Sequence, residues 1–204
     1  MIVAVDIWKS YGDTPVLRGA AIALEKGVTC IRGPNGAGKT TLLKILALLE
    51  RPDRGFVEAF GLKITAEGWD GARAKLAGRI AYVPQEPELY AVPLGSLLGL
   101  CGRREEALSW AKEFGLAPYL GRNATSLSPG LRRRAQLAIA LACARDALLL
   151  DEPAAHLDEE GRELLATALS ARKDLAIAYV EHGEEAARCD RAYALERGVL
   201  RLIY

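Results

Sequence analysis

The hydrophobic positions of the chain form two kinds of pattern, which alternate along the sequence. Short, mostly apolar runs predict strands, and these lie at Ile2–Ile7, Ala20–Leu24, Val28–Ile31, Phe56–Phe60, Arg79–Val83, Ala147–Leu150 and Leu175–Val180. Longer runs rich in helix-forming residues predict helices at Thr41–Leu49, Leu131–Ala144 and Glu159–Leu169. Arg191–Leu195 and Val199–Leu202 predict a closing hairpin. Strands that alternate with helices are typical of an α/β domain with a mostly parallel sheet.

The pattern changes over residues 86–128. Short helical patterns at Leu94–Leu100 and Glu105–Phe114 are interrupted by glycine and proline, and no strand signal is present. We therefore expect one domain over residues 1–204, with a small helical subdomain inserted at 86–128. Trp110 and Phe114 are four residues apart on one predicted helix, so they would make the core contact of this subdomain.

Composition narrows the class of protein. The chain has 204 residues, of which 50% are hydrophobic and 26% charged, as is typical of a soluble globular domain. The formal net charge of +1 creates no overall attraction to nucleic acid, and none is expected as a partner. No apolar segment approaches the roughly 20 residues that cross a bilayer, and the N-terminus lacks a secretory pattern. If the protein serves a membrane, we expect it to dock on another chain.

The four cysteines are Cys30, Cys101, Cys143 and Cys189, and they lie far apart without a C-x-x-C pair. Two of them, Cys30 and Cys143, lie in apolar runs and are expected to be small buried core residues. The spacing supports neither a disulfide framework nor a metal site.

The chemically most informative stretch is Gly33–Thr41, which reads GPNGAGKTT and fits the phosphate-binding pattern G-x-x-x-x-G-K-[ST]. A predicted strand precedes it and a predicted helix follows it, as this motif requires. The glycines let backbone N–H groups point at phosphate oxygens, and the helix N-terminus adds its dipole. Lys39 would reach the β- and γ-phosphates and the Thr40 hydroxyl would ligate Mg²⁺. We therefore predict that the protein binds a nucleoside triphosphate, with a cytosolic location.

Two adjacent carboxylates, Asp151 and Glu152, end a predicted buried strand. Parallel sheets bind their ligands at the carboxyl ends of such strands. One acid there can hold the Mg²⁺ that Thr40 also ligates, and the other can orient or deprotonate a water molecule. Taken singly, the pair could also mark a helix N-terminus, but the phosphate-binding loop favours catalysis. A lone histidine is more often structural than catalytic, but His182 follows the next predicted strand, on the same rim of the sheet. Gly183–Arg188 predicts a short helix.

The stretch from Thr125 to Gly130 predicts the start of a helix. Ser128 suits the N-cap and Pro129 the first helical position. The three consecutive arginines 132–134 would then fall on different faces of this helix. We expect them to form a solvated surface rather than one focused patch.

Two further residues carry little information by themselves. Tyr11 lies in Lys9–Pro15, which is predicted to be a loop. An aromatic ring beside a nucleotide can stack on the base, whereas the local sequence alone favours a half-exposed turn tyrosine. Gln85 follows the strand Arg79–Val83, where glutamine is usually an ordinary loop residue.

Taken in order, these motifs resemble those of the ATP-binding cassette (ABC) ATPase family, and the resemblance covers nearly the whole chain. The matching positions are Tyr11, Gly33–Thr41, Gln85, the signature Leu127–Gly130, Asp151 with Glu152, Asp158 and His182. The resemblance implies an α/β fold with a P-loop NTPase core, in which helices flank a mostly parallel sheet. An N-terminal antiparallel β-subdomain and a small inserted helical subdomain would complete it.

The resemblance also implies a role for each matching residue. Tyr11 would stack on adenine. The residues expected to bind the rest of the nucleotide are Asn35, Gly36, Ala37, Gly38, Lys39, Thr40, Thr41, Ser128, Gly130 and Asp158. Mg²⁺ would be held by Thr40, Gln85 and Asp151. The catalytic set would be Glu152 as general base, His182 on the γ-phosphate, Gln85 and Lys39.

The implied assembly is a head-to-tail dimer around two ATP molecules, made of identical or different cassettes. Ser128 and Gly130 of one chain would complete the site of the other, and the loop Ala155–Asp158 would cross the interface. ATP binding would clamp the dimer and hydrolysis would release it.

The sequence departs from the family pattern in its signature. The family commonly has Leu-Ser-Gly-Gly-Gln, whereas residues 127–131 read Leu-Ser-Pro-Gly-Leu. Pro129 has no backbone N–H to donate, and Leu131 replaces a polar side chain. We expect a weaker or slower composite site, or a heterodimer whose partner has the better signature. The short helical insert also predicts a minimal cassette without a regulatory domain.

The first functional hypothesis is the ATPase subunit of a membrane transporter, bound to the inner face of the cell membrane through its partner. A coupling helix of a membrane-spanning subunit would dock on the Gln85 loop and the helical segment 86–100. The alternative is a soluble ABC-type ATPase that acts in cofactor or macromolecular assembly. A P-loop kinase or GTPase is disfavoured by the signature helix and by the lack of an Asn-Lys-x-Asp motif.

Overall fold

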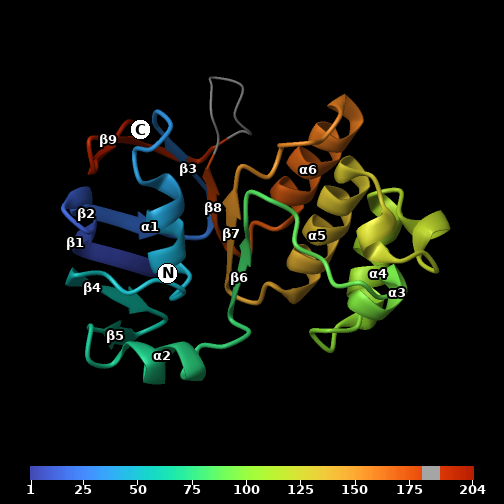
Figure 1. The fold of residues 1–204 in the computed structure, drawn as a ribbon, viewed down its shortest axis with the longest axis horizontal. Helices are drawn as coiled ribbons and strands as arrows, with labels where there is room; N and C mark the ends of the chain where they lie inside the picture. The colour runs from blue at the N-terminus through green and yellow to red at the C-terminus, as the bar shows by residue number, and fades with distance from the viewer. Residues whose placement is uncertain (181–188) are drawn as a thin grey trace.

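The computed structural model describes residues 1–180 and 189–204 (Figure 1). Two sheets and a set of helices make up the fold, and the expected α/β class with its antiparallel subdomain is confirmed. His182 and the short helix expected at Gly183–Arg188 lie outside the described residues. Among the described helices, none has the length and apolar character to cross a bilayer.

An antiparallel sheet of four strands forms the N-terminal part. Its strands are β1 (Ile2–Tyr11), β2 (Thr14–Leu24), β4 (Arg54–Ala59) and β5 (Leu62–Ile64), in the order β2-β1-β4-β5. The prediction of a loop at Lys9–Pro15 is wrong, because β1 and β2 extend as far as a tight turn and Tyr11 pairs with Thr14. Gly12 turns the chain with φ 57°, a conformation that glycine adopts without strain.

The second sheet is mostly parallel and forms the centre of the molecule. Its strands are β3 (Gly27–Arg32), β6 (Ile80–Val83), β7 (Ala147–Asp151), β8 (Ala176–Val180), β9 (Arg191–Glu196) and β10 (Val199–Leu202). They lie in the order β10-β9-β3-β8-β7-β6, and β10 runs antiparallel to its neighbour β9 while the other neighbours pair parallel. Every residue of β7 and β8 is buried, as expected for strands covered on both faces.

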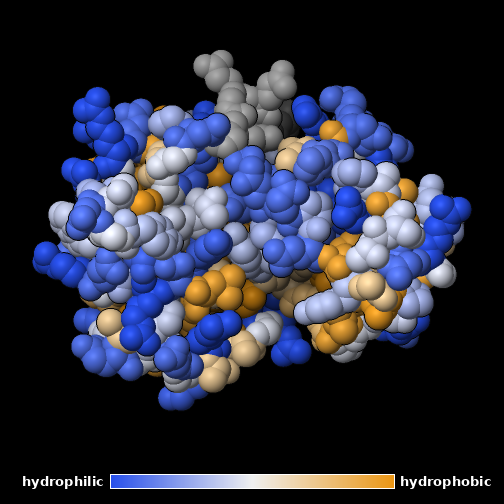
Figure 2. All heavy atoms as spheres, viewed as in Figure 1, coloured by the Kyte–Doolittle hydropathy of each residue, from blue (hydrophilic) through white to orange (hydrophobic). Residues whose placement is uncertain are grey.

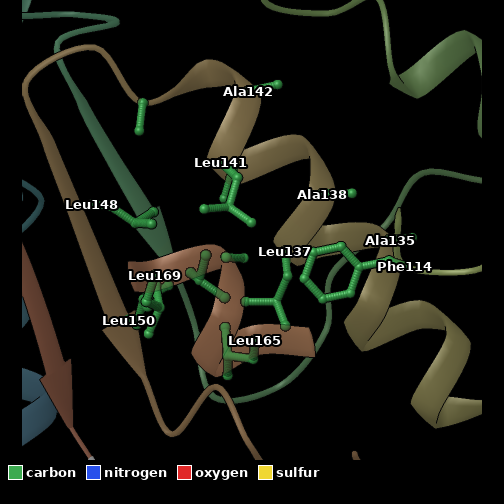
Figure 3. Close-up of a cluster of buried hydrophobic side chains, with 14 of the residues drawn as sticks. Phe114, Ala135, Leu137, Ala138, Leu141, Ala142, Leu148, Leu150, Leu165 and Leu169 are labelled. Carbon is green, nitrogen blue, oxygen red and sulfur yellow. The ribbon is translucent and has the colours of Figure 1, made fainter. Parts of the chain in front are cut away.

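Helices cover both faces of this sheet. They are α1 (Lys39–Leu46), α2 (Trp69–Lys75), α3 (Leu94–Leu97), α4 (Arg104–Glu113), α5 (Pro129–Cys143) and α6 (Glu159–Ala171), with 3-10 turns η1 (Ala117–Tyr119) and η2 (Ala124–Ser126). On one face α1 packs with the antiparallel sheet in a shared core, whereas α4, α5 and α6 build the core of the other face (Figure 1). Figure 3 shows leucines of β7, α5 and α6 meeting in this second core.

The segment 86–128 contains α3, α4 and the two 3-10 turns. Phe114 is buried in the core against α5 and Trp110 packs partly exposed at its edge. The division of the chain into a core and an inserted subdomain stays a prediction. The sequence patterns missed β5 and α2, because elements of three and seven residues are too short to display a period.

The cysteines form two disulfides, and the expectation that they would not is wrong. Cys30 pairs with Cys189 and Cys101 with Cys143, with Cα–Cα distances of 5.8 and 5.5 Å. The partners are 159 and 42 residues apart in the sequence, so spacing alone cannot reveal them. Parallel pairing of β3 with β9 brings the first pair together.

Candidate functional site

The loop between β3 and α1 has the backbone shape of a phosphate cradle. β3 ends at Arg32 and α1 begins at Lys39, with Gly38 at the N-cap in the left-handed region (φ 102°). A side chain at Gly38 would be strained at this φ, and its Cβ would lie 2.8 Å from Val16 Cγ1. Only glycine therefore fits this position. The first N–H groups of a helix have no partner within it and are suited to an anion.

Lys39 is nearly buried and turned into its own loop. Its ammonium group donates hydrogen bonds to Gly33 O at 2.7 Å and to Pro34 O at 2.9 Å. Burial lowers the pKa of the Lys39 amine, and the negative charges of Glu152 and Asp151 act in the opposite direction. A phosphate group close to Lys39 would add a further charge that favours the ammonium form.

A cavity of about 440 Å³ opens over this loop. It is lined by Val16, Asn35, Gly36, Gly38, Lys39, Thr40, Thr41, Gln85 and Glu152. The structure therefore brings Gln85, which follows β6, and Glu152, which follows β7, to the phosphate-binding loop. Ala37 is buried and stands outside this lining.

Tyr11 also stands outside the cavity lining. It ends β1 with 49% of its surface exposed, and Lys9 Nζ lies 5.5 Å from the centre of its ring. The apolar side chain that does line the cavity is Val16 on β2. Sequence reasoning missed Val16, because a lone valine after a predicted loop gives no signal.

Asp151 is fully buried at the carboxyl end of β7. Its Oδ1 accepts no hydrogen bond from the described residues, whereas Tyr82 donates its hydroxyl to Oδ2 at 3.4 Å. Burial raises the pKa of the Asp151 carboxyl, and hydrogen bonding by Thr40 and Tyr82 offsets part of this effect. A buried carboxylate oxygen that accepts no hydrogen bond from the described residues is suited to a cation.

Glu152 has a backbone conformation that is uncommon for its residue type. Its φ is 48°, which costs on the order of 1 kcal/mol for a residue with a Cβ. The N–H of Glu152 donates to Val180 O at 2.9 Å, and its Oε2 accepts a hydrogen bond from Gln85 Nε2 at 3.0 Å. Strain of this kind is typical of functional sites, and here it directs the carboxylate toward the cavity.

Ser128, Gly130 and Asp158 form a second group at the N-termini of α5 and α6, outside the cavity lining. Ser128 is the N-cap of α5, as predicted, and its Oγ accepts a hydrogen bond from Leu131 N at 3.3 Å. Asp158 is the N-cap of α6. A Cβ added to Gly130 would lie 3.0 Å from His156 O, so the start of α5 lies directly against the loop that leads to α6.

A family model described as "ABC transporter" matches residues 18–155 of the 204 residues. The chain belongs to the ABC transporter family. It is therefore an ABC-type ATPase, and the predicted binding of ATP is supported by the family, whereas the roles of the individual loop residues stay predictions.

Two relatives match the ABC cassette over most of its length. This chain is 32% identical over 215 residues to a probable anion import ATP-binding protein of Haloferax volcanii, and the match covers 92% of this chain and 73% of the relative. It is 35% identical over 202 residues to the lipoprotein-releasing system ATP-binding protein LolD of Anaeromyxobacter dehalogenans, covering 91% and 84%. The chain spans only 60% of a putative ABC transporter ATP-binding protein of Archaeoglobus fulgidus and 45% of an Fe(3+) ions import ATP-binding protein of Rhodococcus jostii.

Solved structures share the fold of the ABC cassette. The dimeric bacterial ABC transporter cassette MJ0796 matches with a TM-score of 0.84 and 25% identity, covering 100% of this chain and 99% of that chain. A dimeric post-hydrolysis state of MJ0796 bound to ADP and Pi matches with a TM-score of 0.85 and 24% identity, with the same coverage.

One expectation about α5, the helix that begins within the signature, is wrong. The arginines 132–134 were expected to form a solvated surface, but Arg133 is 0% and Arg134 9% exposed. Helix α5 has the sheet on one side and α4 and α6 on others, so it offers little solvent-facing surface. Arg134 donates to Asp158 Oδ1 at 2.6 Å and to Glu160 Oε2 at 2.9 Å, and thus ties α5 to α6.

Proposed function

We propose that the cassette is the ATP-binding and ATP-hydrolysing subunit of an ABC transporter. Two chains would close around two ATP molecules and power transport through separate membrane-spanning subunits. The cavity in which the phosphate-binding loop meets Gln85 and Glu152 carries the proposal. It combines a cradle for a triphosphate with a carboxylate that can activate water.

The nucleotide would lie along the loop Asn35–Thr41. The N–H groups of this loop, including that of Ala37, and of the first turn of α1 would surround the β- and γ-phosphates. Lys39 Nζ would exchange its hydrogen bonds with Gly33 O and Pro34 O for phosphate oxygens, which are stronger acceptors. The exposed ring of Tyr11 would stack on adenine.

Mg²⁺ fits the residues at the base of the cavity. Asp151 Oδ1, buried and unpaired among the described residues, is an oxygen of the kind that a hard cation takes as a ligand. Thr40 and Gln85 would contribute the other protein oxygens. When bound, Mg²⁺ would neutralise negative charge on the phosphate oxygens.

Glu152 would be the general base of hydrolysis. Its carboxylate would accept a proton from the water that attacks the γ-phosphorus. The hydrogen bond from Gln85 Nε2 at 3.0 Å orients the carboxylate, and the left-handed backbone of Glu152 aims it at the cavity. The proposed contact of His182 with the γ-phosphate lies outside the described residues.

Dimerisation would supply the remaining contacts to ATP. Ser128, Gly130 and Asp158 lie outside the cavity of their own chain, so they would act on the nucleotide of a second cassette. Ser128 is exposed at the N-terminus of α5, where its hydroxyl and the helix dipole favour an anion. The dimeric state of MJ0796, a cassette of the same fold, supports this arrangement.

A groove beside the ATP cavity is suited to a membrane partner. It has a volume of about 300 Å³ and lies between β6, α3 and α5, with mostly apolar residues such as Leu89, Leu97 and Ile139 in its lining. Tyr90 and Leu100 at its edge are 73% and 65% exposed. Figure 2 shows apolar side chains beside α3 and α4 on this face. Pro84, the residue before Gln85, lines the groove. A helix that docks there could therefore act on Gln85 and on its contact with Glu152.

A capture experiment tests the proposal. Tagged Glu152→Gln protein, which would keep ATP and the closed dimer, is incubated with solubilised native membranes, Mg²⁺ and ATP. We expect a protein with several membrane spans to be recovered. The matched control adds Leu100→Asp, which is expected to fold because Leu100 is exposed, and should lose this partner. Recovery of soluble partners only, with the chain absent from the membrane fraction, would favour the assembly ATPase instead.

A further inference from the structure

Arg133 is the largest fully buried side chain among the described residues. Arg133 lies near the N-terminal end of α5, and its guanidinium reaches the main chain of two separate loops. Nη1 donates to Pro84 O at 2.8 Å, and Nη2 donates to Gln85 O. Longer contacts of 3.4 Å run from Nη2 to Glu152 O and from Nε to Ala155 O.

These contacts are made to carbonyl groups, and every hydrogen-bond partner of the guanidinium among the described residues is uncharged. Burial lowers the pKa of Arg133, while the charges of Glu86, Asp151 and Glu152 oppose this effect. Burying a cation among neutral acceptors costs free energy, and an apolar side chain would fill the same space at lower cost. We therefore expect the buried Arg133 side chain to have a role other than packing.

The two loops that Arg133 joins are those that present Gln85 and Glu152 to the ATP cavity. Both side chains line this cavity and form the 3.0 Å hydrogen bond between Gln85 Nε2 and Glu152 Oε2. Arg133 stands outside the cavity lining. It holds the backbone behind the contact, and its planar fork can bind several carbonyl groups at fixed angles.

We propose that Arg133 is a positioning residue for ATP hydrolysis. It fixes the main chain of Gln85 relative to that of Glu152, so that the hydrogen bond between their side chains is maintained. The proposal rests on the proposed function of the cassette. Gln136, one turn further along α5, accepts from Arg133 Nη1 at 2.8 Å and lines the apolar groove. The same guanidinium thus also connects the wall of the groove to the catalytic pair.

A double-mutant cycle tests this role. The variants are Arg133→Lys, Gln85→Ala and the two combined, and kcat and the KM for ATP are measured for each. Lysine keeps the charge but lacks the fork, so Arg133→Lys should lower kcat about 10- to 100-fold and change KM less than about twofold. In the Gln85→Ala background the same change should lower kcat less than about threefold, because the contact that Arg133 maintains is already lost.

Equal losses in both backgrounds, or an unchanged kcat in Arg133→Lys, would overturn the proposal. Arg172→Lys is the matched control, since Arg172 also donates to main-chain carbonyls, those of Leu141 and Ala144, which do not belong to the cavity lining. It should leave kcat unchanged. If Arg133→Lys does not fold, Gln136→Leu, which removes only one acceptor of Arg133, takes its place in the cycle.

Hydrogen exchange separates this proposal from the proposed function. In Arg133→Lys, peptides that cover residues 84–88 and 152–157 should exchange faster than in the parent, whereas the loop at 33–41 should not change. This result is independent of turnover. A parent that binds but does not hydrolyse ATP would contradict the proposed function, while slow, unchanged exchange in both peptides would contradict the role of Arg133.

Discussion

Gln85 Nε2 donates a hydrogen bond to Glu152 Oε2 at 3.0 Å, although the two residues are 67 positions apart in the sequence. The contact joins the chain segments that leave β6 and β7, two neighbouring strands of the parallel sheet. It lies beside Lys39 and Thr40 in the wall of one cavity. The apolar groove, the proposed general base and the phosphate-binding loop thus meet within a few residues of the same sheet edge.

Replacing Lys39 should weaken ATP binding. Its ammonium group lies at the phosphate-binding loop, and charge-assisted hydrogen bonds to phosphate are worth about 1.5–3 kcal/mol. Lys39→Ala is therefore expected to lower the affinity for a non-hydrolysable ATP analogue about 10- to 100-fold in titration calorimetry. Lys112→Ala, at an exposed position of α4 outside the cavity lining, is the control and should bind as the parent does.

Replacing Asp151 should increase the stability of the protein while abolishing its activity. Burial raises the pKa of Asp151 above its ordinary value of 3.8, so the folded state disfavours the charged carboxylate at neutral pH. Asp151→Asn removes this charge and should increase the free energy of unfolding by about 1–3 kcal/mol without nucleotide. The same variant should lose Mg²⁺-dependent hydrolysis.

The pH dependence of this effect has a defined sign. A carboxyl whose pKa is raised on folding destabilises the protein at pH values above the folded pKa, and this penalty disappears as protons bind. The difference in melting temperature between Asp151→Asn and the parent should therefore shrink as the pH falls through the raised pKa toward 3.8. A variant that melts below the parent at pH 7 would contradict this account.

The Cys101–Cys143 disulfide should stabilise the connection between the helical segment and α5. It closes a loop of 42 residues, for which the constraint on the unfolded chain is worth roughly 2–4 kcal/mol. Cys101→Ser combined with Cys143→Ser should lower the free energy of unfolding in urea by about this amount. Titration of four free thiols in unreduced, denatured protein would contradict both disulfides.

The unusual signature should slow the composite site. Pro129 is the first residue of α5 and has no N–H to offer a phosphate, and Leu131 is apolar. Pro129→Gly combined with Leu131→Gln is expected to raise the ATPase rate several-fold. Leu131→Gln alone tells whether the missing N–H or the missing amide matters more. An unchanged rate in the double variant would show that neither departure has a cost.

Much of the fold and of the ATP site could be predicted from the sequence. The β3–loop–α1 unit is local, so its glycines, Lys39 and the flanking pattern suffice to locate it. The burial of β7 follows from its continuous apolar run, and Ser128 and Pro129 mark the start of α5 by their own chemistry. Gln85 became informative only through the ordered set of motifs.

The features that sequence could not reveal depend on contacts between distant segments. Arg133 looks like a surface residue until α5 is surrounded by other elements, and all of its acceptors except Gln136 Oε1 are main-chain groups that any sequence would have. The disulfides join positions whose approach is set by sheet order and helix packing. Val16 lines the cavity over the phosphate-binding loop because β2 passes beside Gly38, which no local pattern indicates.

The most direct test of the central claim is the mass of Glu152→Gln protein in solution, measured by light scattering with and without ATP and Mg²⁺. Glutamine keeps the shape of Glu152 but cannot accept the proton of the attacking water. The account predicts a species of one chain without nucleotide and of two chains with ATP, two bound ATP molecules per dimer, and turnover at least about 100-fold below the parent. A variant that stays a single chain with ATP and hydrolyses it at the parental rate would contradict the account.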